Sequence, residues 1–117
     1  MAKTVGSLEQ LLMFAVLKLG DDAHGLAIRQ AVERAAGRQV SHGALYTTME
    51  RLQRHGLVGS WIGSETPEGG GRRRKFYRLE PAGATALRDG YAGLRRLADG
   101  TLEALEGLAA EAMGGGA

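Results

Sequence analysis

The stretch that decides the fold is Ser41-His42-Gly43-Ala44-Leu45-Tyr46-Thr47-Thr48-Met49-Glu50-Arg51-Leu52-Gln53-Arg54-His55-Gly56. Leu45, Met49 and Leu52 recur at helical spacing, so they share one side of an α-helix and are expected to face a core. Ser41 is a suitable N-cap, and Gly56 follows the last periodic residue as a C-terminal stop. The stretch is therefore predicted to be one capped helix over 41–55.

The opposite side of this helix has a different composition. It carries small residues near its start, then a hydroxyl group, then charged groups: Gly43, Ala44, Thr47, Glu50, Arg51 and Arg54. Small residues allow a helix to approach a DNA groove closely, and guanidinium groups bind phosphates. This side is therefore predicted to face DNA.

Two further helices are predicted before this stretch. Ser7 to Gln10 fits an S-x-x-Q capping box that starts a first helix, which Gly20 ends. This helix has a broad apolar stripe, which suggests burial on more than one side, against a partner subunit as well as the core: Leu8, Leu11, Leu12, Ala15, Val16 and Leu19.

The second helix is predicted over 24–36, with Asp21 or Asp22 as its cap and Gly37 as its end. Its expected inward row is Ile28, Val32 and Ala35. Only residues 38–40 separate it from the Ser41 cap, and Val40 is placed to fill the angle between the two helices. This short connection is typical of a helix-turn-helix, with 41–55 in the position of the recognition helix.

After Gly56 the pattern becomes extended. Residues 57–62 and 76–79 are rich in β-branched and large apolar residues, and the segment 63–71 between them holds Pro67 and three consecutive glycines. The two runs are predicted to form a β-hairpin, so the region is a winged helix-turn-helix. A run of cations follows the expected tip: Arg72, Arg73, Arg74 and Lys75.

A long final helix is predicted after Pro81. Apolar residues recur along it at the 3.5-residue spacing of a coiled-coil seam, which predicts a partner helix. Gly93, Gly100 and Gly107 also recur every seven residues and are expected to be tolerated inside this helix because they allow close backbone approach. The predicted organisation is a DNA-binding domain over 1–80 and a C-terminal dimerisation helix with a disordered Gly-rich tail over 81–117. The fold class is mainly α with a small β-hairpin.

The composition excludes several functions. The 117 residues contain no cysteine, so disulfides and thiolate metal sites are absent, and the formal net charge is +2. We find no membrane-spanning run, export signal, nucleophile elbow or phosphate loop, so we expect a cytoplasmic non-enzyme without a cofactor. A metal site at His24, His42 and His55 with Asp21 and Asp22 is not supported by their spacing.

Several motifs occur in the order and spacing of one family. They are Leu11-Leu12, His24-Gly25-Leu26-Ala27-Ile28, Ser41-x-Gly43-Ala44-Leu45-Tyr46, Leu52-x-x-x-Gly56-Leu57-Val58, Arg74-Lys75-Phe76-Tyr77-Arg78-Leu79 and Ala82-Gly83. The chain resembles PadR-family transcriptional regulators, of the small subgroup with a single C-terminal helix. The resemblance covers roughly residues 7–97 and implies a cytoplasmic homodimer that represses transcription. Thr47 stands where proline is common in the family, and the last helix lacks a tryptophan that some drug-binding relatives use to stack planar ligands.

The predicted function is sequence-specific binding of double-stranded DNA by a homodimer, through the helix 41–55 and the basic wing 69–76, at an operator with two half-sites. The expected DNA contacts are Ser41, His42, Gly43, Ala44, Tyr46, Thr47, Arg51, Arg54, Arg72, Arg73, Arg74 and Lys75. The expected dimer contacts are Leu8, Leu11, Leu12, Leu87, Tyr91, Leu94, Ala98, Leu102, Leu105 and Leu108.

Two alternatives stay open. The first is a winged-helix module that binds proteins and not DNA. The second is a regulator that responds to a small-molecule effector, bound in a pocket at the dimer interface. Trp61 and Tyr77 are expected to be core or junction aromatics, although both are placed to line a pocket between the wing and the last helix.

Overall fold

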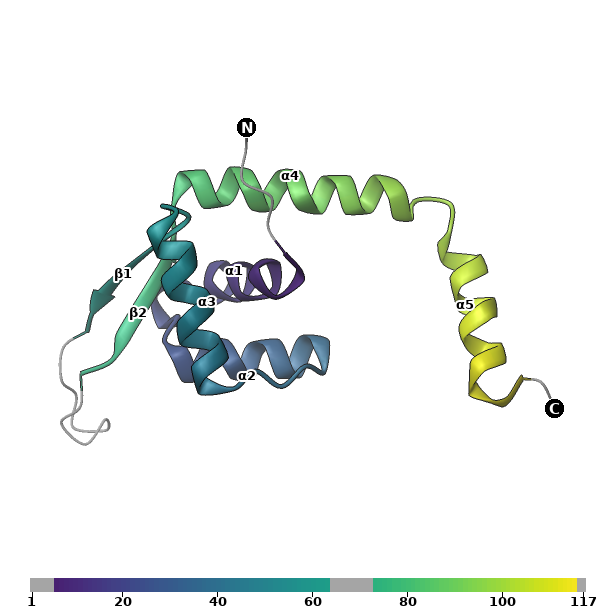
Figure 1. The fold of residues 1–117 in the computed structure, drawn as a ribbon, viewed down its shortest axis with the longest axis horizontal. Helices are drawn as coiled ribbons and strands as arrows, with labels where there is room; N and C mark the ends of the chain where they lie inside the picture. The colour runs from purple at the N-terminus through teal and green to yellow at the C-terminus, as the bar shows by residue number, and fades with distance from the viewer. Residues whose placement is uncertain (1–5, 64–72, 116–117) are drawn as a thin grey trace. The chain divides into compact units, whose positions relative to one another are not determined.

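The computed structural model describes residues 6–63 and 73–115 (Figure 1). Its described part is mainly helical with a two-stranded antiparallel hairpin, which confirms the predicted fold class. The elements in chain order are α1 (Ser7–Leu19), η1 (Gly20–Asp22), α2 (Gly25–Ala36), α3 (His42–Arg54), β1 (Val58–Ile62), β2 (Lys75–Leu79), α4 (Pro81–Ala98), α5 (Leu102–Ala110) and the π-helical turn η3 (Glu111–Gly115). The chain divides into two compact units, Met1–Leu87 and Arg88–Ala117.

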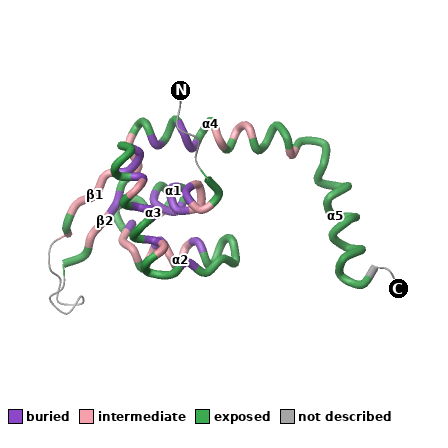
Figure 2. Tube along the Cα trace, viewed as in Figure 1, coloured by how far each residue is buried: buried purple, intermediate pink, exposed green. Residues whose placement is uncertain are grey.

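The core of the first unit is built by α1, α2 and α3 together with residues of β1, β2 and the start of α4 (Figure 2). The predicted inward row of α3 is confirmed, because Leu45, Met49 and Leu52 are all fully buried. Thr48 is also buried, which the apolar pattern did not indicate. On α2, Ile28 and Val32 are buried as predicted, but Ala35 is exposed because it lies in the last turn, beyond the packed part of the helix.

Of the three predicted N-caps, the one of α3 is confirmed and those of α1 and α2 differ in the structure. Ser41 caps α3 as expected, since its Oγ accepts a hydrogen bond from the Ala44 N–H at 3.0 Å. The α1 cap is one residue earlier than predicted: Gly6 is the N-cap, and the Glu9 carboxylate accepts from its N–H at 2.8 Å. The predicted cap of α2 is also wrong. Asp21 and Asp22 belong to η1, and His24 is the N-cap residue.

The hairpin pairs β1 with β2 in antiparallel register, with Trp61 opposite Phe76 and their rings stacked 5.4 Å apart. The strand β2 is tied to the helices by the Tyr77 N–H, which donates to the Ala23 carbonyl at 2.8 Å, and by a bridge between His24 and Phe76. Tyr77 points inward and is 2 % exposed, whereas its neighbour Arg78 is exposed. The predicted tip, including Arg72, lies outside the described residues.

The helix α4 begins against the first unit. Gly83, Ala86 and Leu87 are buried there, and a Cβ on Gly83 would collide with the Leu57 carbonyl oxygen. The close packing explains why a glycine stands at position 83 in the first turn of the helix. No helix in the described ranges is long and apolar enough to cross a membrane.

The C-terminal region differs from the prediction of one long helix. Helix α4 ends at Ala98, Gly100 adopts a left-handed φ of 79°, and α5 starts at Leu102. The Thr101 hydroxyl donates to the Ala98 carbonyl at 2.6 Å and satisfies one acceptor at the helix end. Gly100 thus ends a helix, as glycines commonly do.

Candidate nucleic-acid interface

The N-terminal half of α3 is anchored on one side and open on the other. Residues 41–43, 46 and 47 are exposed, and Ala44 is half-buried. No heavy atom lies within 4 Å of the position that a Cβ on Gly43 would take, apart from the helix backbone nearby in sequence. The His42 and Tyr46 rings lie 4.6 Å apart, which places two polar aromatic groups side by side on the open surface. The predicted base-contacting residues are therefore presented together.

A groove of about 350 Å³ separates the rest of α3 from β2. Its lining combines aromatic and charged side chains from both elements: Tyr46, Glu50, Gln53, Arg54, Lys75 and Tyr77. The Lys75 Nζ lies 5.7 Å from the centre of the Tyr77 ring. Burial raises the pKa of Tyr77 to about 12, and Tyr46 adds to this shift, so the phenol stays neutral at physiological pH.

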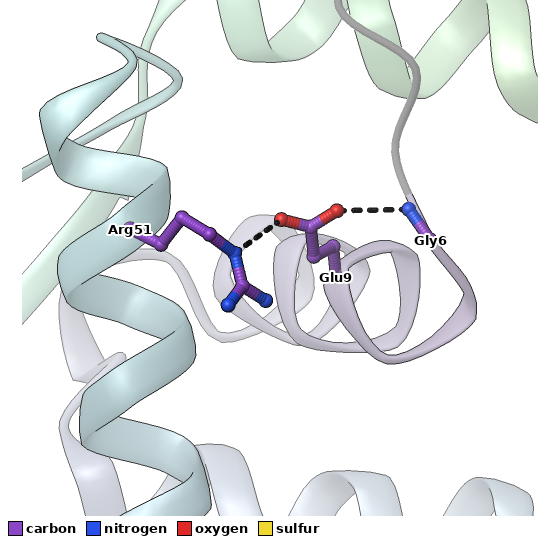
Figure 3. Close-up of polar contacts among 3 residues, drawn as sticks. All are labelled: Gly6, Glu9 and Arg51. Carbon is purple, nitrogen blue, oxygen red and sulfur yellow. Dashed lines mark hydrogen bonds and ion pairs between the residues drawn. The ribbon is translucent and has the colours of Figure 1, made fainter.

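Arg51 does not lie free on the outer side of α3. Its Nε donates to the Glu9 Oε2 on α1 at 3.3 Å, and the other Glu9 oxygen accepts from the Gly6 N–H (Figure 3). Glu9 is only 7 % exposed, so this carboxylate needs a cation beside it. Arg51 therefore links α3 to α1, while its side chain stays 42% exposed. Its predicted contact with the DNA backbone stays a prediction. Arg54, one turn later, is exposed.

Three of the four predicted wing cations lie in the described part of the chain. Arg73 and Arg74 are exposed, and Lys75 is half-buried. An Arg74 Nη atom lies 3.0 Å from the His24 Nε2. Burial lowers the pKa of His24, Arg74 lowers it further, and Asp22 opposes the shift. The sequence places His24 inside the predicted helix 24–36, whereas the structure has it one position before α2, as the N-cap. Histidine is not among the common N-cap residues, so the sequence gives little signal for this role.

The predicted dimer contacts fall into three groups by burial. Leu12 and Leu87 are 0 % and 2 % exposed within the single chain, so they belong to its core and are removed from the expected interface. Leu8 and Leu11 are partly buried against the same core. The exposed members are Tyr91, Leu94, Leu102, Leu105 and Leu108, and Ala98 is half-buried.

Trp61 of the hairpin borders a second cavity of about 390 Å³. Half-buried Trp61 lines it together with Val16, Leu17, Gly20, Asp21, Arg78 and Leu79, all from the first unit. Tyr77 is a core residue, as expected. Among residues 6–63 and 73–115, no group of three histidines or carboxylates is placed to hold a metal ion.

Comparisons with known proteins agree on the class of protein. The sequence pattern of the transcriptional regulator PadR-like family matches residues 13–89. The transcriptional regulator Rv3488 of Mycobacterium tuberculosis is 39% identical over 78 residues, which are 67% of this chain and 68% of that protein.

Solved structures show the same fold. A PadR family transcription regulator from Clostridium difficile superposes with a TM-score of 0.72 at 24% identity, over 86% of this chain and 99% of that one. A PadR family transcriptional regulator from Eggerthella lenta has a TM-score of 0.63 at 30% identity, over 85% and 86% of the two chains. The family consists of transcriptional regulators and not of enzymes. With its winged helix-turn-helix fold and these matches, the chain belongs to the PadR-like family of transcriptional regulators.

Proposed function

We propose that the protein is a repressor that acts in the cytoplasm and binds, as a homodimer, an operator with two related half-sites. The observation that carries this proposal is the two-sided character of α3. Three fully buried residues fix the helix to the core, while the opposite side of its first two turns is exposed, and Tyr46 on this half shares a groove with Lys75 of β2.

Each group on this surface has a distinct proposed role. The small residues Gly43 and Ala44 allow the helix to enter the major groove. Ser41, His42, Tyr46 and Thr47 contact base edges or nearby phosphates. Arg54, Arg73, Arg74 and Lys75 bind phosphates, as does Arg72, which is assigned from the sequence alone. Arg51 serves mainly to hold α3 in place.

The homodimer is proposed from the second unit. Leu94, Leu102 and Leu105 are each about 60% exposed in the single chain. Burying a leucine side chain contributes roughly 1.5–3 kcal/mol, so a second copy that covers these residues would gain several such contributions. A symmetric dimer presents two copies of α3 to half-sites ~34–36 Å apart.

Selection of bound sequences from random double-stranded DNA by the purified protein tests the proposal. We expect enrichment of an inverted repeat whose half-sites are about one helical turn apart. Addition of the protein should then reduce transcription in vitro from a promoter that contains the selected sequence. The absence of any enriched sequence would favour the protein-binding alternative.

Phosphate contacts are tested by salt dependence. Fluorescence anisotropy should show affinity that falls steeply with salt concentration, and Arg73→Ala should lower the slope by about one unit. If binding does not depend on salt, the proposed phosphate contacts are wrong.

A further inference from the structure

The side chain of His24 lies between two hydrogen-bond donors. Its Nδ1 is 3.4 Å from the Ala27 N–H in the first turn of α2, and its Nε2 is 3.0 Å from an Nη atom of Arg74. The ring packs edge-on against Phe76, with centroids 5.7 Å apart. His24 thus joins the start of α2 to the residue that leads into β2.

A neutral imidazole has only one acceptor nitrogen, because the other nitrogen carries the proton. The two contacts are therefore alternatives. Both neighbours are donors, so the closer one decides: Arg74 at 3.0 Å, against 3.4 Å for the Ala27 N–H, assigns the lone pair to Nε2 and the proton to Nδ1. In this tautomer His24 stands at the N-cap position but does not accept from the Ala27 N–H. Burial and the adjacent guanidinium lower the pKa of His24, which keeps the ring neutral and able to accept at physiological pH.

The backbone of Arg74 is also fixed. Its carbonyl accepts a hydrogen bond from the Gly63 N–H at 2.7 Å, at the open end of the β1–β2 ladder. With its main chain held by Gly63 and one Nη atom held by His24, the guanidinium keeps its remaining donors for another acceptor. A guanidinium that is oriented before binding loses less conformational entropy when it meets a phosphate.

We propose that His24 is a positioning residue for DNA binding, which holds the Arg74 guanidinium through Nε2 in an orientation that suits a backbone phosphate. This inference rests on the proposed DNA-binding function. It adds a residue of α2 to the machinery of the wing.

Two substitutions separate this role from the capping role. In His24→Gln the amide oxygen is placed like Nε2, so it still accepts from Arg74. In His24→Asn the oxygen is placed like Nδ1, so it caps α2 well but does not reach Arg74. Anisotropy with the selected operator should show near wild-type affinity for His24→Gln and a loss of roughly three- to tenfold for His24→Asn, the size of one hydrogen bond.

A double-mutant comparison assigns the loss to Arg74. His24→Asn combined with Arg74→Ala should bind no more weakly than Arg74→Ala alone, because the positioned group is already absent. Combined with Arg73→Ala, the matched control next to it in the chain, His24→Asn should still cause its full loss. Thermal unfolding should show that His24→Asn is at least as stable as the wild type, because the asparagine oxygen supplies the capping bond to α2.

The tautomer gives a test that needs no DNA. Nitrogen-15 spectra of the imidazole should show the proton on Nδ1 in the wild type, and a shift of this equilibrium in Arg74→Ala. A proton on Nε2 in the wild type would overturn the inference. So would a wild type that binds the operator no more tightly than His24→Asn does. A wild type that binds no DNA would overturn the proposed function itself, and the inference with it.

Discussion

The two units of the chain bury their apolar residues to very different degrees. In the first unit, Leu12 of α1 and Leu45 and Leu52 of α3 are all fully buried in one hydrophobic core. In the second unit, Leu97 is 82 % exposed, and no residue of α5 is buried. Both regions are leucine-rich helices, so the difference lies in what covers the leucines.

This contrast shows that apolar periodicity has two meanings. In α3 the periodic apolar row is buried in the core of the same chain and stabilises the fold. In α5 the leucines find no cover within their own unit, so they leave apolar surface that favours association. The first unit is expected to supply the DNA-reading surface, and the second the spacing between two such surfaces.

The largest effect is expected in the core of the first unit. Leu52→Ala removes a fully buried side chain from α3 and should lower the free energy of unfolding by about 2–5 kcal/mol in urea titrations. The matched variant Leu105→Ala removes the same atoms from an exposed site of α5. It should change stability by less than about 0.5 kcal/mol in dilute, monomeric protein. Equal losses in the two variants would contradict the distinction between the units.

The next effect concerns association. Leu94→Glu combined with Leu105→Glu places two charges on the exposed apolar surface of the second unit and should convert a dimer into monomers in sedimentation experiments. Operator affinity should fall about 100-fold or more, because the second half-site no longer binds as part of the same molecule. Circular dichroism should show that the helical content is kept. A wild-type protein that sediments as a monomer would refute the dimer.

The parts of this structure that the sequence predicted are local ones. The Ser41 cap, the buried row of α3 and the end of α2 at Gly37 each depend on residues within one or two helical turns. The hairpin was also predicted, since its strands change period from 3.6 to 2. In the interface, the exposed N-terminal half of α3 follows directly from the same periodicity.

The failures have tertiary or competing causes. Glu9 and Arg51 are 42 residues apart, and no sequence pattern pairs them. Leu12 lies in a stripe too wide to divide between core and dimer without the packing of α2 and α3. The seven-residue repeat of glycines predicted that they lie inside one long helix. Gly100 instead adopts a left-handed conformation, and the helix ends before it.

A smaller effect distinguishes two arginines within the first unit. Arg51→Ala should lower the free energy of unfolding by about 1–3 kcal/mol, because it removes a charged hydrogen-bond partner from the buried Glu9 carboxylate. Arg54→Ala, one turn later and exposed, should change stability by less than about 0.5 kcal/mol but weaken operator binding. Urea titration and anisotropy on both variants measure the two quantities. Weaker DNA binding with full stability in Arg51→Ala would show that Arg51 acts as a DNA contact and not as a link to Glu9.

The smallest effect is a dependence of stability on alkaline pH that arises from Tyr77. In the folded protein, burial raises the pKa of this phenol from 10.0 to about 12. Between these values the unfolded chain has lost the phenolic proton and the folded chain has kept it. The unfolded state therefore binds fewer protons, and the free energy of unfolding falls as pH rises from about 10 to about 12.

Tyr77→Phe removes this titration and keeps the buried ring. Urea titrations at pH 8, 10 and 11 should show a shallower decline for the variant than for the wild type, while groups common to both proteins cancel in the difference. The stabilisation that Tyr77 gives through its protonated phenol is fully present below pH 10, so the two stability curves should run parallel there and separate only above it. If they stay parallel up to pH 11, the phenol titrates normally, and β2 does not seal Tyr77 into the core as tightly as its 2 % exposure indicates.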